Sequence, residues 1–125
     1  MFDHLSLGAA DLERSRRFYD ATLAALGVTR LVTGEDQLGY GADTVGLWLL
    51  KTARPVPSEA DSGLHLCFAA VDRTAVDGFH AAALAHGGRD HGAPGLRADY
   101  AADYYAAFVI DPDGYRLEAY TASPT

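Results

Sequence analysis

The sequence predicts an α+β fold made of two βαβββ modules, which form a curved mixed sheet (a half-barrel) with the helices on its outer face. The main observation is an internal repeat. When the chain is shifted by 61 positions, nine of the 24 residues from His4 to Gly27 meet an identical residue without a gap. A chain of this composition gives roughly two or three such matches by chance. The second observation is Asp111-Pro-Asp-Gly between two apolar runs, which is a strong hairpin signal.

The first copy reads as a strand, a helix and three further strands. Phe2–Gly8 is the predicted first strand. Asp11 is the predicted N-cap of the helix, because its carboxylate can accept hydrogen bonds from the free amides of the first turn. Gly27 suits the left-handed conformation that ends a helix. The apolar residues at helical spacing are Leu12, Tyr19, Leu23 and Leu26, and the later strands are Val28–Thr33, Gln37–Gly41 and Thr44–Lys51.

The second copy repeats this order. Leu64–Ala70 is the predicted strand, Asp72 is the N-cap, and the helix ends at Gly87-Gly88. Gly92–Gly95 is predicted as a long loop because it is rich in glycine and proline. Neither copy can cover its own sheet alone, so we expect the two to combine around a common concave face. The last two predicted strands are Tyr104–Ile110 and Tyr115–Thr121.

Length and charge restrict the class of protein. The 125 residues suit one domain, with module one at about 1–52, a linker at about 53–62 and module two at about 63–125. A net charge of −7 repels phosphate backbones and anionic membranes, so we expect no nucleic-acid partner and no membrane partner. The single cysteine, Cys67, excludes an intramolecular disulfide, and neither a signal peptide nor a long apolar run is present. These features favour a cytoplasmic protein.

Three side chains with metal-ligand chemistry are predicted to meet on one face of the sheet. His4 and His65 occupy the same place in the two copies. Glu118 lies in the last strand on the face opposite Leu117 and Ala119, and a carboxylate buried there needs a partner. Two imidazoles and a carboxylate bind a divalent metal and leave positions open for a substrate. We predict these three as ligands of Zn, Ni, Mn or Fe. Structural histidines and an arginine partner for Glu118 are the alternative.

Four motifs accompany this order of elements. They are His4-Leu-Ser-Leu, Asp11-Leu-Glu-Arg-Ser-Arg-Arg-Phe-Tyr-Asp, His65-Leu-Cys-Phe and Asp111-Pro-Asp-Gly-Tyr-Arg-Leu-Glu118. The motifs and the order of elements resemble the vicinal oxygen chelate superfamily, which includes glyoxalase I, extradiol dioxygenases, methylmalonyl-CoA epimerase and the fosfomycin- and bleomycin-resistance proteins. The resemblance covers nearly the whole chain and implies metal ligands on the first and fourth strands of the modules.

Two activities of that superfamily match these residues poorly. Alignment of the two final hairpins puts Trp48 opposite Glu118, where the resemblance to glyoxalase I would require a carboxylate. Extradiol dioxygenases carry a tyrosine where this chain has Phe108, and an upstream histidine that this chain lacks and for which Tyr104 or Tyr105 could substitute. The resemblance therefore argues against glyoxalase I activity and against ring cleavage.

We therefore expect a metal-dependent enzyme with isomerase, lyase or addition chemistry on a small molecule with two neighbouring oxygens. Glu118 and Tyr104 are the catalytic candidates, and metal-bound water is a further source of acid–base chemistry. The alternative is a drug-binding resistance protein of the bleomycin-resistance type, with or without metal. We also expect a homodimer, because exposed sheet edges favour pairing. The predicted substrate-binding residues are Trp48, Phe108, Arg97 and Phe2, with Arg97 as a clamp for an anionic group.

Structural roles are the alternative for several candidates and the prediction for the other polar residues. Core packing is the alternative for each aromatic residue named above, and a solvated loop position is the alternative for Arg97. We expect Cys67 to be a small buried core residue. The run Glu13–Arg17 is predicted to be the solvated side of the first helix. The histidines assigned to the surface are His80, His86 and His91.

Overall fold

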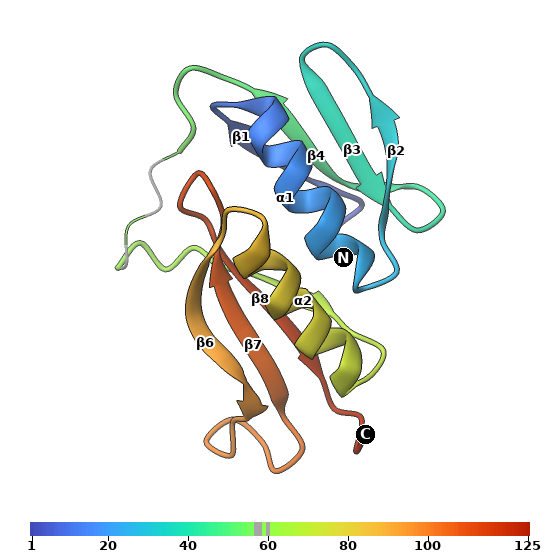
Figure 1. Ribbon diagram of the computed structural model, residues 1–125, viewed down its shortest axis with the longest axis vertical. Helices are drawn as coiled ribbons and strands as arrows, with labels where there is room; N and C mark the ends of the chain where they lie inside the picture. The colour runs from blue at the N-terminus through green and yellow to red at the C-terminus, as the bar shows by residue number, and fades with distance from the viewer. Residues whose placement is uncertain (57–58, 60) are drawn as a thin grey trace.

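The computed structural model describes residues 1–56, 59 and 61–125, so part of the predicted linker lies outside the described residues. It confirms the predicted fold class, with two βαβββ modules (Figure 1). Module one comprises β1 (Leu5–Ala9), α1 (Leu12–Ala24), β2 (Thr29–Thr33), β3 (Gln37–Gly41) and β4 (Val45–Lys51). Module two comprises β5 (Leu66–Ala69), α2 (Arg73–Ala85), β6 (Arg89–Leu96), β7 (Tyr105–Ile110) and β8 (Arg116–Thr121).

The strands form two four-stranded mixed sheets, one in each module. Their orders are β1-β4-β3-β2 and β5-β8-β7-β6, so corresponding strands hold corresponding places. In each sheet the first strand pairs with the fourth in parallel, and the other pairs are antiparallel. The first strands, β1 and β5, are therefore equivalent edges of the two sheets.

The helices pack side by side and each covers one face of its own sheet (Figure 1). The resulting apolar core is continuous across both modules. Neither described helix is long and apolar enough to cross a membrane. The sheet faces opposite the helices are called here the open faces. The core includes Phe18, Tyr19 and Leu23 of α1, Val76, Phe79 and Ala83 of α2, and Leu47, Leu49, Leu117 and Ala119 of the sheets.

Both predicted helix caps are confirmed, but the glycines after the helices differ from the repeat. The Asp11 and Asp72 carboxylates accept hydrogen bonds from backbone amides in the first turns of their helices. Gly27 has a φ of 76° after α1, as predicted, whereas after α2 the positive φ of 95° belongs to Gly87. Gly88, the repeat partner of Gly27, is required for close packing. A Cβ there would lie 2.6 Å from Phe18 Cε2.

The predicted loop at Gly92–Gly95 is wrong, because β6 runs through it. The glycines make this strand possible by allowing irregular pairing with β7 on either side of Gly92, whose φ is 149°. Pro94 is tolerated because β6 is an edge strand, so one side of its backbone needs no partner. The composition of this segment indicated a break in secondary structure, whereas the segment forms an irregular edge strand.

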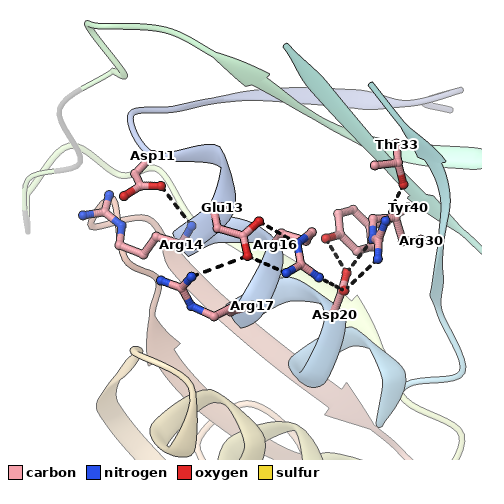
Figure 2. A network of polar contacts seen from close by, with 9 residues as sticks. All are labelled: Asp11, Glu13, Arg14, Arg16, Arg17, Asp20, Arg30, Thr33 and Tyr40. Atoms are coloured by element: carbon pink, nitrogen blue, oxygen red, sulfur yellow. Dashed lines mark hydrogen bonds and ion pairs between the residues drawn. The ribbon is translucent and has the colours of Figure 1, made fainter. Parts of the chain in front are cut away.

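The charged surface of α1 is internally paired (Figure 2). Glu13 binds both Arg16 and Arg17, and Asp20 binds Arg16 and Arg30. The Tyr40 hydroxyl also donates to Asp20, which ties α1 to β3. The basic residues of this helix are therefore neutralised by neighbouring carboxylates rather than gathered into a free basic face.

Candidate active site

A cavity of about 700 Å³ lies on the open face of module two. It combines a carboxylate, two imidazoles and several aromatic rings, which is the usual composition of a small-molecule site. All of its lining residues belong to the second half of the chain. They are Gly63, Leu64, His65, Cys67, His91, Tyr100, Tyr104, Phe108, Arg116 and Glu118.

Glu118 is the centre of this site. It lies on β8, with Cys67 of β5 and Phe108 of β7 as its cross-strand neighbours. Its side chain is only 3% exposed, and burying a carboxylate is costly unless its oxygens are hydrogen-bonded. His65 Nε2 lies 2.9 Å from Glu118 Oε1, and the Tyr104 hydroxyl donates to Oε2 at 2.5 Å. Both carboxylate oxygens are thus held by cavity residues.

Tyr104 is fixed on its other side by aromatic contacts. Its ring packs 4.1 Å from that of Tyr120 at an angle of 31°, and 5.0 Å from that of Tyr100 in an edge-on arrangement. Burial, followed by the hydrogen bond to Glu118, raises the pKa of Tyr104 above its usual value of 10.0. The hydroxyl therefore keeps its proton at neutral pH and acts as a donor.

Cys67 is exposed to this cavity, so its assignment to the buried core was wrong. The thiol itself is partly shielded from water, and this desolvation, together with the nearby charge of Glu118, raises the pKa of Cys67 to about 12. At neutral pH the group is a protonated thiol and a poor nucleophile. Cys67 therefore lines the cavity as a small side chain and is not a reactive group.

His4 lies apart from these residues in the single chain. Its side chain is 48% exposed, and its Nδ1 lies 2.6 Å from the Asp3 carboxylate. Among the described residues, no three His, Cys, Asp or Glu side chains are placed to hold one metal ion. The predicted set is thus divided: His65 and Glu118 meet, but one chain does not bring His4 to them.

Two predicted substrate-binding residues also lie outside this cavity. Phe2 is 70% exposed and borders the seam between β1 and the segment that carries His65. Trp48 lies on the open face of module one, opposite Gly39 in the β3–β4 register. Its ring occupies the space over Gly39, where a Cβ would come within 2.9 Å of Trp48 Cζ3. The predicted match of Trp48 with Glu118 agrees with their positions on β4 and β8.

The guanidinium of Arg97, predicted as an anion clamp, already contacts other groups of the chain. Its guanidinium donates to the Ala93 carbonyl at 2.7 Å and lies 5.4 Å from the centre of the Phe108 ring. Gly92 and Gly95 make room for it, because a Cβ at either position would lie 3.2 Å from its terminal nitrogens. Arg97 thus packs against the back of the aromatic wall, while Phe108 itself lines the cavity as predicted.

Sequence reasoning missed His91 and Tyr100. His91 was assigned to the surface, and it is exposed, but it also lines the cavity. The segment of β6 was predicted to be a loop, so the alternation of side chains along a strand was not used to place His91. Tyr100 lies in the segment between β6 and β7, where no periodicity places a side chain.

The two central side chains have the chemistry and spacing to bind a divalent metal ion. A nitrogen and an oxygen that each lie about 2.1 Å from one metal are themselves roughly 3.0–3.4 Å apart. His65 Nε2 and Glu118 Oε1 are 2.9 Å apart, so a small side-chain movement suffices. These two residues fit a metal but do not complete a three-ligand site.

The sequence matches one family model over residues 1–119, that of the Glyoxalase/Bleomycin resistance protein/Dioxygenase superfamily. The chain belongs to this superfamily. The resemblance stated from the motifs is thereby confirmed. Members of the superfamily typically bind divalent metals and small molecules, and many are dimers. No curated protein matches the chain.

Solved structures of the superfamily agree with the fold. The chain is similar to a glyoxalase/bleomycin resistance protein from Albidiferax ferrireducens T118, with 34% identity, a TM-score of 0.82, and coverage of 96% of this chain and 97% of that one. A glyoxalase I mutant from Zea mays has 21% identity and a TM-score of 0.73, and the match covers 95% of this chain but 46% of that one. The fosfomycin resistance protein FosX from Mesorhizobium loti has 16% identity and a TM-score of 0.70, with 99% and 93% coverage. These last two likenesses concern the fold alone.

Proposed function

We propose that the chain is the subunit of a metal-dependent enzyme whose substrate is a small molecule with two neighbouring oxygens. The observation that carries this proposal is the pairing of His65 with the buried carboxylate of Glu118 at 2.9 Å, inside a cavity of about 700 Å³. A bound divalent ion would polarise the substrate oxygens and stabilise negative charge that develops on them. Isomerase, lyase and addition reactions all use that chemistry.

The side chains around this pair have distinct roles in the proposal. Glu118 and His65 hold the ion. Tyr104 stays protonated and donates its one hydroxyl proton to the second oxygen of Glu118, so its role is to fix the orientation of this carboxylate. Phe108 and Tyr100 form aromatic walls against which the substrate would be oriented.

The third ligand in this proposal is His4 of a second copy of the chain. His4 precedes β1, on the side that alternation assigns to the open face of module one, and its side chain is half exposed. A second chain that lays this face over the open face of module two would bring an imidazole to His65 and Glu118. The predicted homodimer and the predicted ligand set then describe the same assembly.

Metal titration of protein purified without an affinity tag tests the proposal. We expect about one divalent ion per chain for the wild type, and at least tenfold weaker binding for His65→Ala and for Glu118→Ala. His80→Ala is the matched control, because His80 forms the same kind of pair with Asp90 at 2.8 Å outside the cavity. Unchanged affinity in all three variants would contradict the proposal.

The aromatic lining of the cavity favours a second candidate, a protein that sequesters a planar drug without catalysis. Tyr100 is 66% exposed and its ring stands edge-on to Tyr104 beside Phe108, an arrangement suited to stacking. In that case ligand affinity would fall in Tyr100→Ala and stay unchanged in Glu118→Ala and after removal of metal. Ligand binding that requires both Glu118 and the ion supports the enzyme.

A further inference from the structure

The turn between β7 and β8 reaches across to module one. The Asp113 carboxylate is 3% exposed and accepts hydrogen bonds from three groups of the β1–α1 corner. They are the Ala10 amide at 3.2 Å, Arg14 Nη2 at 3.0 Å and Ser15 Oγ at 3.4 Å. A turn that was expected only to close a hairpin therefore makes a polar contact between the modules.

Two more residues of the same turn extend this contact. The hydroxyl of the fully buried Tyr19 on α1 donates to Asp111 Oδ2 at 2.5 Å. Asp111 Oδ1 accepts the amides of Asp113 at 2.9 Å and Tyr115 at 2.8 Å, which sets the shape of the turn. The Tyr115 hydroxyl then donates to the Gly8 carbonyl at the end of β1, also at 2.8 Å.

We propose that turn 111–115 is a latch that holds module two against module one, and that a proton on Asp111 sets how firmly it holds. The groups that face Asp111 are Tyr19 on α1 and its own neighbours Asp113 and Tyr115. Among the described residues, Arg14 is the cation of this cluster, and it bonds to Asp113 rather than to Asp111. The module-one turn has Gly41 and Val45 at the places of Asp111 and Tyr115, so the latch belongs to one module only.

The direction of the pH effect follows from burial. Desolvation raises the pKa of Asp111 from 3.8 to about 6, although the hydrogen bond from Tyr19 opposes the rise. The folded chain therefore binds this proton more tightly than the unfolded chain does, and stability from this group grows as the pH falls. Between pH 7.5 and pH 5 the folding equilibrium constant should increase about tenfold from this group alone.

The latch also borders the candidate site. A cavity of about 400 Å³ lies along the seam between the modules, with Gly8 and Tyr115 on its wall together with His65. A looser latch at higher pH would alter the seam next to one of the proposed ligands. The latch itself rests on different residues and stands whether or not the chain binds metal.

Urea unfolding of the wild type and Asp111→Asn at several values between pH 5 and pH 7.5 tests the latch. The asparagine oxygen can accept the two turn amides, and its NH₂ group can face the Tyr19 hydroxyl, so the fold is kept while the titration is removed. We expect the ratio of the two unfolding constants to change about tenfold over this range. A ratio that stays within twofold would overturn the proposal.

Two further measurements separate a latch from a general effect on stability. Hydrogen exchange in segments 8–15 and 111–115, corrected for the intrinsic pH dependence, should slow on acidification in the wild type and not in Asp111→Asn. Segments that open only with the whole chain should slow by the same factor as global unfolding, so an absence of slowing in 8–15 and 111–115 would contradict a local latch. The carboxyl ¹³C shift of Asp111 in the wild-type protein should titrate near pH 6, and at higher pH in Tyr19→Phe. A midpoint near 4 would overturn the proposal even if the asparagine variant failed to fold.

Discussion

The two modules share a backbone but carry different chemistry on their open faces. Module two has Glu118 opposite Phe108 in the β7–β8 pair, and module one has Trp48 opposite Gly39 in the corresponding β3–β4 pair. In module one the aromatic ring is on β4, where Trp48 covers Gly39, and in module two it is on β7, where Phe108 faces Glu118. Trp48 therefore occupies the position at which module two has its carboxylate. The same architecture thus forms a polar cavity in one copy and an apolar wall in the other.

The repeat therefore fixes the direction in which a side chain points but not its chemical role. His4 and His65 occupy matching positions, but His65 pairs with the buried carboxylate of Glu118 at 2.9 Å, whereas His4 pairs with the exposed carboxylate of its neighbour Asp3. The sheet of module two supplies the site, and module one supplies a face that can cover it. Variants at matched positions of the two modules therefore test how the open faces differ.

The largest expected contrast lies between Cys67 and its counterpart Ser6. The pKa of Cys67 is raised to about 12 from an ordinary 9.0, so its thiolate population at pH 8 falls by about a thousandfold. We expect alkylation by iodoacetamide to be more than tenfold slower than for free cysteine, because the higher nucleophilicity of a more basic thiolate offsets only part of that loss. In Cys67→Ser combined with Ser6→Cys, the new thiol has no carboxylate equivalent to Glu118 and should react within about tenfold of free cysteine. Equal rates at the two positions would contradict the electrostatic difference between the open faces.

The second contrast concerns two glycines that the repeat aligns. Gly88→Ala should lower the free energy of unfolding by about 3 kcal/mol, because the new methyl group would collide with Phe18 Cε2 and the Ala83 carbonyl. Gly27→Ala meets no atom within 4 Å and suffers only from the φ of 76°, which costs about 1 kcal/mol. Chemical denaturation of both variants measures the difference, and a larger loss in Gly27→Ala would reverse the assignment of roles.

The smallest contrast tests how Tyr104 supports Glu118. Tyr104→Phe removes the hydroxyl that donates to Oε2 and should weaken divalent metal binding about tenfold, as loss of a group that orients a ligand commonly does. Tyr100→Phe makes the same chemical change on the neighbouring ring and should leave metal affinity within twofold. Similar losses in both variants would show that the hydroxyl of Tyr104 has no specific role.

The sequence was enough to predict the fold and to place two of the three proposed ligands, His65 and Glu118, at one site. The repeat, the two aspartate caps and the Asp-Pro-Asp-Gly turn are local signals, so they predicted the modules and helix starts correctly. Alternation placed Glu118 on the face opposite the core, and it lies there with His65, Tyr104 and Phe108. These predictions needed only the period of a strand and the cost of burying a carboxylate.

The rest depended on how the modules pack, which local patterns do not encode. Alternation gives the face of a strand, but it does not say whether two such faces oppose one another in one chain. Packing of α1 beside α2 decides this, and it leaves His4 and Trp48 away from the cavity. The place of His91 in the cavity wall was missed because a strand interrupted by Gly92 and Gly95 has the composition of a loop.

Mixing two variants that each lack one proposed ligand is the most direct test of whether the site combines modules from different chains. His4→Ala and Glu118→Ala are each expected to have lost tight metal binding. After unfolding and refolding together in equal amounts, half of the dimers would contain one chain of each kind, and each mixed dimer would hold one intact set of ligands. We expect tight metal binding to rise from near zero to about one quarter of the wild-type content per chain. No recovery on mixing, with each variant still folded and dimeric, would contradict it.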